Sequence, residues 1–301
     1  MSKHLMLAKT YKTDKDLIFP LYVSEKLDGV PVCISCDMTN GVSAVSRQGK
    51  RVGSIDHILA VLDGILPVGC QLIGELYIPG EDFKTISGLA RRNKSCTDTA
   101  KLELHVYDYY SQFKPNLSFI DRRAELFTTI TLMRDGNSPV QCIAQYAMPN
   151  KIKLESFITR FNAEHPQAEG LMLRAWNGEV SKFKAGWRSP GMLKMKTTCD
   201  IDLPVHSFEE AVSASGEPLG MVGRINVVYI KDVEEDGDNH YNVHQIIGVG
   251  PGKMTHEERK RVWENRGDYL GKYIEIRYMP DPSYNALREP RFYRFREDKD
   301  E

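Results

Sequence analysis

The sequence has little cysteine, and its charges almost cancel. Six cysteines in 301 residues are too few for a disulfide framework. Cys33 and Cys36 form a CxxC pair, but no second pair lies at a spacing suitable for zinc. The cysteines are therefore expected to be reduced core residues.

Long apolar runs are also absent. No segment reaches the roughly 18 consecutive apolar residues that a transmembrane helix needs. The N-terminal segment 1–16 lacks the apolar core of a signal peptide. We therefore expect a cytoplasmic protein, or one inside the host cell if it is viral, without membrane contacts.

The formal net charge of −1, from 40 basic and 41 acidic residues, excludes a globally basic nucleic-acid protein. A basic groove remains compatible with this balance if acidic residues are segregated to another face. The apolar fraction of 41% and the charged fraction of 27% are typical of soluble globular proteins. The length is sufficient for two domains.

The pattern along the chain predicts an α+β protein. Residues 17–80 read as strands and turns, interrupted by a helix for which Ser54 is the expected N-cap. Amphipathic helices are expected at 119–133 and 154–165. The pattern changes near Cys199: strands dominate the remaining residues, with one helix that begins with a capping box at Thr255 and Glu258. This part predicts a small barrel of the oligonucleotide-binding (OB-fold) type at 199–301, after a domain at 1–198.

The segment "SEKLDGVPV" at 24–32 places Lys26 two residues before the Asp28-Gly29 pair. Asp-Gly between two apolar runs predicts a β-hairpin, with Lys26 at the junction of strand and turn. A lysine in such a place is ordinarily a solvated residue. Whether Lys26 has a chemical role depends on which charged residues from other parts of the chain lie beside it.

Charged residues recur within strands that are otherwise apolar. Glu75 follows Leu72 and Ile73, Glu169 precedes a run of apolar residues, and Lys194 and Lys196 share one face of a strand. Burial of such charges is costly unless they have partners. A polyphosphate and a divalent cation would supply those partners, and phosphoryl or nucleotidyl transfer depends on such positioning and charge neutralisation.

These residues form an ordered set of motifs that resembles the ATP-dependent DNA ligases among the covalent nucleotidyltransferases. The matching segments are "KLDG" at 26–29, "SRQGK" at 46–50, "GELYIPG" at 74–80, "VYDYY" at 106–110, "EGLMLR" at 169–174, "LKMK" at 193–196 and "REPRFYRFREDK" at 288–299. The resemblance implies a nucleotidyltransferase (adenylation) domain of antiparallel sheets with flanking helices, followed by an OB-fold domain. It is closest in type to the compact enzymes of viruses, phages and some bacteria.

The resemblance also implies roles for individual residues. Lys26 would attack the α-phosphate of ATP, and Lys194 and Lys196 would contact that phosphate. Glu75 would hold the ribose, Glu169 a metal ion, and both carboxylates are candidate ligands for Mg²⁺ or Mn²⁺. The other residues expected to bind the nucleotide are Ser24, Glu25, Arg47, Tyr107 as a stacking surface for adenine, Arg296 and Lys299.

Nicked duplex DNA is the expected partner of a monomeric enzyme acting in replication, repair or recombination. The residues expected to contact DNA are Arg47, Arg91, Arg92, Lys94, Lys182, Lys184 and Arg188. The acidic run at 232–238 is an unsuitable clamp for a phosphate backbone.

The sequence departs from the family pattern at three places. Pro31 stands five residues after the lysine, where many relatives carry an arginine that contacts the nick phosphate. Ser24 stands where several relatives have an acid that faces adenine. We also expect the large N-terminal DNA-binding domain of replicative cellular ligases to be absent, because Lys26 lies so near the first residue.

Three other functions share parts of this pattern. An mRNA capping guanylyltransferase carries the same lysine motif and forms a lysyl–GMP, whereas an RNA ligase ordinarily lacks the C-terminal motif. A nucleic-acid-binding protein with this fold and no catalysis is the alternative outside enzymes. Labelling of the protein by ATP or by GTP distinguishes these possibilities.

Overall fold

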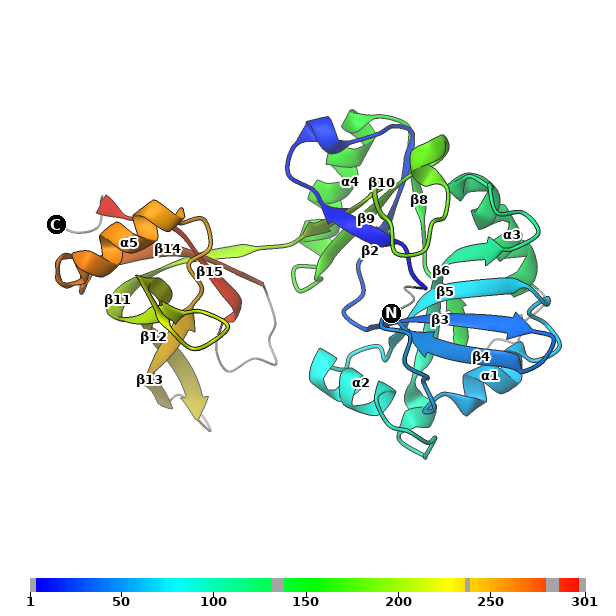
Figure 1. Cartoon of the computed structure of the whole chain (residues 1–301), viewed down its shortest axis with the longest axis horizontal. Helices are drawn as coiled ribbons and strands as arrows, with labels where there is room; N and C mark the ends of the chain where they lie inside the picture. Colours follow the sequence, from blue (N-terminus) through cyan, green and yellow to red (C-terminus); the bar gives the residue numbers. More distant parts are fainter. Residues whose placement is uncertain (1–3, 132–137, 236–238, 280–286, 298–301) are drawn as a thin grey trace. The chain divides into compact units, whose positions relative to one another are not determined.

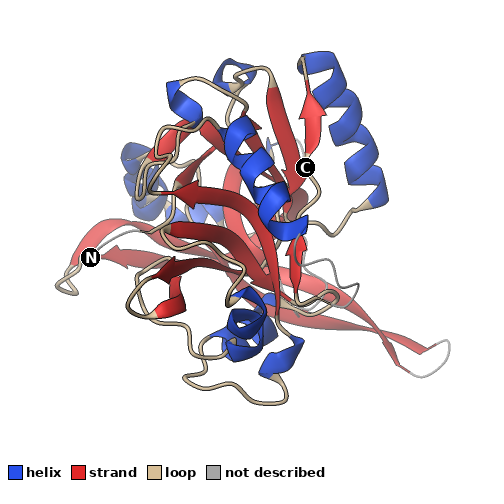
Figure 2. Ribbon diagram, turned by 90° about the vertical axis from the view of Figure 1, so that its right-hand side faces the viewer, coloured by secondary structure: helices blue, strands red, loops and turns tan. Residues whose placement is uncertain are grey.

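The computed structural model describes residues 4–131, 138–235, 239–279 and 287–297, without the side chains of 231–243. The chain forms two compact units, Met1–Lys196 and Thr197–Glu301, and each is described by itself (Figure 1). Helices flank the sheets, which are mainly antiparallel, as expected for an α+β protein (Figure 2). None of the helices in the described part of the chain has the length and apolar composition that a membrane crossing needs.

The first sheet of unit 1 is built from both ends of that unit's sequence. Its strand order is β1 (Leu7–Thr10), β10 (Arg188–Lys196), β9 (Gly170–Ala175), β2 (Leu21–Glu25) and β8 (Tyr146–Met148). β1 runs parallel to β10, and the other neighbours are antiparallel. Its apolar face packs on helix α4 (Lys151–Glu164) through Leu154, Phe157 and Phe161.

The second sheet of unit 1 comes from the middle of the sequence. Its strand order is β4 (Gly41–Ser46), β3 (Val30–Asp37), β5 (Cys70–Tyr77), β6 (Glu103–Ser111) and β7 (Val140–Cys142). The helices associated with it are α1 (Asp56–Leu62), α2 (Phe83–Ala90) and α3 (Phe119–Thr131). Short 3-10 turns in unit 1 cover Asp14–Asp16, Thr99–Lys101 and Glu179–Ser181.

Two sequence-based expectations for unit 1 are wrong. β2 and β3 do not form a hairpin around Asp28 and Gly29, because β2 pairs with β8 and β9 while β3 pairs with β4 and β5. The Asp-Gly turn instead carries the chain from one sheet to the other. Gly29 is needed there, since a Cβ would lie 2.4 Å from the carbonyl oxygen of Leu76. Ser54 is not the cap of α1: Ile55 takes that position, and the Ser54 hydroxyl donates to the carbonyl of Ala90.

Unit 2 contains one sheet with strand order β13 (Asn239–Val249), β12 (Pro218–Glu235), β11 (Cys199–Val212), β14 (Tyr273–Met279) and β15 (Arg288–Phe295). Helix α5 (His256–Glu264) begins with the predicted capping box, in which Thr255 and Glu258 bond to each other's backbone amides. A 3-10 turn, Arg266–Tyr269, follows. Val262 of α5 joins the apolar core of the sheet.

The expected continuous barrel is not formed among the described residues of unit 2. The edge strands β13 and β15 approach each other, but a single bridge links them, between Gly250 directly after β13 and Arg291 within β15. There the Gly250 amide donates to Pro290, and the Phe292 amide donates back to Gly250. Pro251 and Pro290 have no amide hydrogen, so neither can extend this ladder.

Candidate active site

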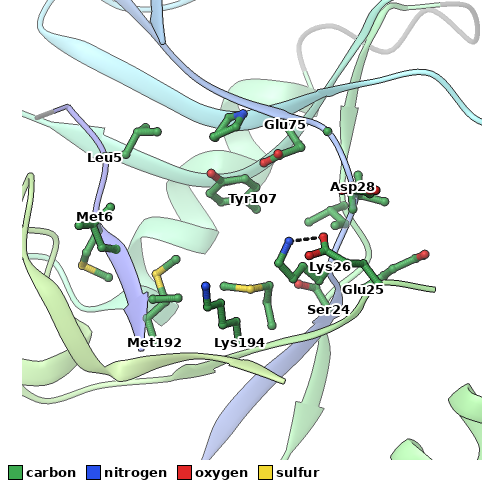
Figure 3. Close-up of a pocket in the computed structure, with 18 of the residues that line it drawn as sticks. Leu5, Met6, Ser24, Glu25, Lys26, Asp28, Glu75, Tyr107, Met192 and Lys194 are labelled. Atoms are coloured by element: carbon green, nitrogen blue, oxygen red, sulfur yellow. Dashed lines mark hydrogen bonds and ion pairs between the residues drawn. The ribbon is translucent and has the colours of Figure 1, made fainter. Parts of the chain in front are cut away.

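A cleft of about 340 Å³ opens between the two sheets of unit 1 (Figure 3). The chain passes from one sheet to the other at residues 26–29, and Lys26 is among the residues that line the cleft. Apolar side chains also line the cleft, including Met172, Met192 and Ile143. The residues predicted for the nucleotide site that line it are Ser24, Glu25, Lys26, Arg47, Glu75, Tyr107, Glu169 and Lys194.

Lys26 is fixed at both its backbone and its side chain. Its amide donates to the carbonyl of Gly170 at 2.8 Å, directly after β2 ends at Glu25. Its Nζ donates to Oε2 of Glu169 (Figure 3). The Lys26 side chain remains 22% exposed, so the amine is paired and still accessible from the cleft.

Glu169 is a buried carboxylate shared by two ammonium groups. Its side chain is 7% exposed, and Oε1 lies 3.6 Å from Nζ of Lys196. Gly170 follows with φ 142°, and a Cβ there would lie 2.0 Å from the carbonyl oxygen of Met195. The "EG" pair therefore serves two purposes, because glycine permits the close approach of β9 to β10 while the glutamate reaches the lysines.

The floor of the cleft is rich in cations. Lys194 on β10 points into it, close to Lys26 in Figure 3. Burial lowers the pKa of Lys194, and the charges of Lys196 and Lys26 lower it further. Arg47 and Arg188 also line the cleft, and Arg188 donates to the carbonyl of Ala8. Such a positively charged surface favours the binding of a polyanion.

Glu75 on β5 faces the cleft from the second sheet. Burial raises the pKa of its carboxyl to about 8, although the nearby charge of Lys26 acts in the opposite direction. In the nucleotide-free protein this carboxyl therefore holds a proton near neutral pH. A cation bound beside it would displace that proton.

We expect Glu75→Gln to change the pH dependence of stability. The folded chain retains the Glu75 proton up to about pH 8, whereas the unfolded chain releases it near the ordinary value of 4.5, so wild-type stability falls as pH rises between these values. Glutamine does not titrate. The variant should therefore gain about 4 kcal/mol relative to wild type between pH 5 and 9, measured by urea unfolding.

The matched control is Glu81→Gln, an exposed carboxylate shortly after β5. Its stability difference from wild type should change little over the same range. A pH-independent difference between Glu75→Gln and wild type would contradict the assignment of a protonated carboxyl.

The other predicted contact residues lie outside the cleft lining. Arg91, Arg92 and Lys94 are exposed after α2, where Arg92 bonds to Cys96 and lies 3.3 Å from Asp98. Lys182 pairs with Glu179, and Lys184 lies 5.0 Å from the Trp187 ring.

The predicted phosphate contacts of the C-terminal motif belong to unit 2. Arg296 forms a 2.6 Å ion pair with Asp202 of β11. Lys299 lies outside the described residues.

Several residues that line the cleft were not predicted. Arg174 lines it from β9, and its signal was present as a charge at the end of the apolar run in "EGLMLR". Leu5 and Met6 line another part of the cleft. Nothing local to the sequence marks them, because their place depends on the pairing of β1 with the distant strand β10.

A lysine amine among carboxylates and cations, in a cleft between two mainly antiparallel sheets, is the arrangement expected of a nucleotidyltransferase. The chain matches the ATP-dependent DNA ligase domain over residues 5–196, and it belongs to this family. It is therefore an enzyme of the DNA ligase class that uses ATP.

Solved structures agree with this fold. A structure of Pmar-Lig is 23% identical, with a TM-score of 0.75 over 98% of this chain and 67% of that one. A Lig E DNA ligase is 20% identical, with a TM-score of 0.71 over 98% of this chain and all of that one. The bacteriophage T7 ATP-dependent DNA ligase in complex with ATP is 19% identical, with a TM-score of 0.54 over 98% of both chains. A comparison with curated protein sequences finds no match.

Proposed function

We propose that this protein seals nicks with 3′-hydroxyl and 5′-phosphate ends in duplex DNA. Lys26 Nζ loses its ammonium proton to solvent and attacks the α-phosphorus of ATP; a phosphorus–nitrogen bond forms, and pyrophosphate leaves. The AMP then passes to the 5′-phosphate of the nick. Attack by the 3′-hydroxyl forms the phosphodiester bond and releases AMP. The observation that carries this proposal is the accessible Lys26 amine, held by Glu169 inside a cation-rich cleft.

Two cleft carboxylates fit a divalent cation. Among the described residues, no group of three or more ligating side chains is assembled in advance. Mg²⁺ commonly takes one or two carboxylates and completes its shell with substrate phosphates and water. Glu169 and Glu75 would hold Mg²⁺ or Mn²⁺, which when bound supplies charge neutralisation at the phosphates.

The two units would have different roles in the reaction. Residues 1–198 would act as the adenylation domain and 199–301 as the OB-fold domain. Arg296 and Lys299 would bring positive charge to the β- and γ-phosphates, so that pyrophosphate leaves more easily. We propose that the enzyme acts as a monomer in the cytoplasm or the host-cell interior, where ATP and nicked DNA are available.

A gel assay tests the proposal most directly. Purified protein is incubated with labelled ATP or GTP, and then with nicked duplexes made of DNA or of mixed RNA and DNA strands. ATP-specific labelling and sealing of the DNA nick are expected. Labelling by GTP alone would indicate a guanylyltransferase, and sealing confined to RNA strands would indicate an RNA ligase. Neither alternative is favoured by the family match.

DNA contacts are expected to make nick binding strongly dependent on salt. The candidates are exposed cations after α2 and near β10, together with Arg47 and Arg188 at the cleft. Pro31 also lines the cleft in place of the usual arginine, so these two guanidinium groups are the candidates for the nick phosphate.

Replacement of Arg91 and Arg92 with alanine should weaken nick binding and make its salt dependence shallower. Each lost phosphate contact reduces the slope of log affinity against log salt by about 0.9. The measurement is the dissociation constant for nicked DNA between 50 and 200 mM salt. Self-adenylation, which needs no DNA, should not change.

The control is Lys153→Ala with Arg160→Ala, which removes the same charge from the exposed face of α4. The proposal for Arg91 and Arg92 fails if both double variants change the salt slope equally, because the effect would then come from net charge.

A further inference from the structure

Tyr107 occupies an irregular position in its strand. On β6, Asp108 pairs with Ile73 and Val106 pairs with Gly74, so no residue of β5 lies opposite Tyr107. Tyr107 is therefore the extra residue of a β-bulge. A bulge turns a side chain away from the direction that regular alternation would give it. Here the ring lines the nucleotide cleft (Figure 3).

Two side chains donate hydrogen bonds to the backbone carbonyl of this bulged residue. Arg174 Nη1 and Gln145 Nε2 each donate to it at 3.0 Å. The Arg174 guanidinium also lies 5.7 Å from the centre of the Tyr107 ring. These contacts hold both the backbone and the ring.

Arg174 is in turn held by a buried carboxylate. Asp108 Oδ2 accepts from Arg174 Nη2 at 2.8 Å, and both carboxylate oxygens accept from Arg122 of α3. The Asp108 side chain is 1% exposed, and the amide of Tyr109 donates to it as well. Asp108 lies on the second sheet and Arg174 on the first, so this pairing fixes the two walls of the cleft against each other.

We propose that Asp108, through Arg174, and Gln145 are positioning residues that hold Tyr107 in its bulge so that the ring presents a fixed stacking surface to the nucleotide base. This inference rests on the proposed function. None of the three acts on the phosphates. Their loss should therefore weaken recognition of the base and leave recognition of the triphosphate intact.

Gln145→Met provides the main test, because Gln145 is half-buried and its replacement leaves Asp108 paired with Arg122 and Arg174. The other bond that the variant loses is the one that Gln145 Oε1 accepts from Arg123. Gln141→Met is the control, since the hydrogen bond of the Gln141 side chain in the described structure goes to Ser138 and not to Tyr107. The probes are α,β-methylene-ATP, which binds without transferring AMP, and ribose 5-triphosphate, which has no base. Calorimetry measures both dissociation constants with the full-length protein.

For Gln145→Met we expect about tenfold weaker binding of α,β-methylene-ATP, within the range of a lost base–aromatic contact. Binding of ribose 5-triphosphate should change less than about twofold, and Gln141→Met should match wild type with both probes. In a Tyr107→Leu background, Gln145→Met should have no further effect.

Equal weakening of both probes would show general loosening of the cleft and overturn the proposal. Unchanged binding of α,β-methylene-ATP would overturn it as well. Asp108→Asn should give a larger loss of the same kind, measured only if circular dichroism shows a folded protein. If wild type binds the analogue but neither self-adenylates nor seals nicks, the proposed function fails while the role of Tyr107 can still be measured.

Discussion

Lys26→Ala is expected to abolish covalent labelling by ATP. Lys26 supplies an amine that donates to Glu169, and alanine cannot form the phosphorus–nitrogen bond. The rate of self-adenylation should fall by at least about a thousandfold, as measured by intact-protein mass spectrometry after incubation with ATP. Sealing of a nick that already carries AMP should continue, because that step does not require the lysyl–AMP.

The change should cost little stability. Glu169 loses one ammonium partner and keeps Lys196 at 3.6 Å, so we expect the free energy of unfolding to fall by about 1–2 kcal/mol. Lys26→Arg is the matched control, since it restores a positive charge beside Glu169 but remains protonated and cannot act as a nucleophile. A normal yield of AMP adduct on either variant would remove Lys26 from the mechanism.

Arg296→Ala is expected to produce the second largest defect. If Arg296 reaches the β- and γ-phosphates, its loss leaves charge on the departing pyrophosphate without compensation. Guanidinium groups in that role contribute about a thousandfold or more in related phosphoryl transfers. The single-turnover rate of self-adenylation at saturating ATP measures this loss.

Arg294→Ala tests whether the position of the charge matters. Arg294 lies on β15, two residues before Arg296, and its Nε bonds to Glu275 at 2.6 Å. This control removes an equal charge from β15 but should leave the adenylation rate within a few-fold of wild type. Sealing of a pre-adenylated nick should also be less affected by Arg296→Ala than self-adenylation is. Equal self-adenylation rates for Arg296→Ala and Arg294→Ala would show that Arg296 has no specific role in the departure of pyrophosphate.

Local signals were sufficient for some features of the fold. The capping box at Thr255 and Glu258 was predicted from neighbouring residues, and the structure confirms it, because such a cap depends only on one helical turn. The α+β class was also predictable from the periodicity of the strands and helices. The ordered motifs identified the family, and the predicted residues Lys26, Glu75 and Glu169 do line one cleft. Their individual roles remain predictions.

Features that depend on distant pairing were not predictable. Asp28 and Gly29 carry a strong hairpin signal, yet the strands on either side find partners in different sheets. The bulge at Tyr107 depends on its register with β5, and the bonds to its carbonyl come from residues 145 and 174. A single sequence contains these residues but does not show which of them are in contact in the folded protein.

In the sequence, the strands of the second sheet of unit 1 lie between strands of the first sheet. This order has a consequence for folding during synthesis on the ribosome. The second sheet, formed from residues 30–142, is complete in the nascent chain while β2 still lacks β9. Domains fold from the N-terminus as the chain emerges, and unpaired strand edges favour aggregation during that interval. Lys26 emerges early, but Glu169 and Lys194 join it only when nearly all of unit 1 has been made. Lys26 is thus assembled with Glu169 and Lys194 at the end of the unit's folding, and a chain that lacks β9 and β10 cannot form this site.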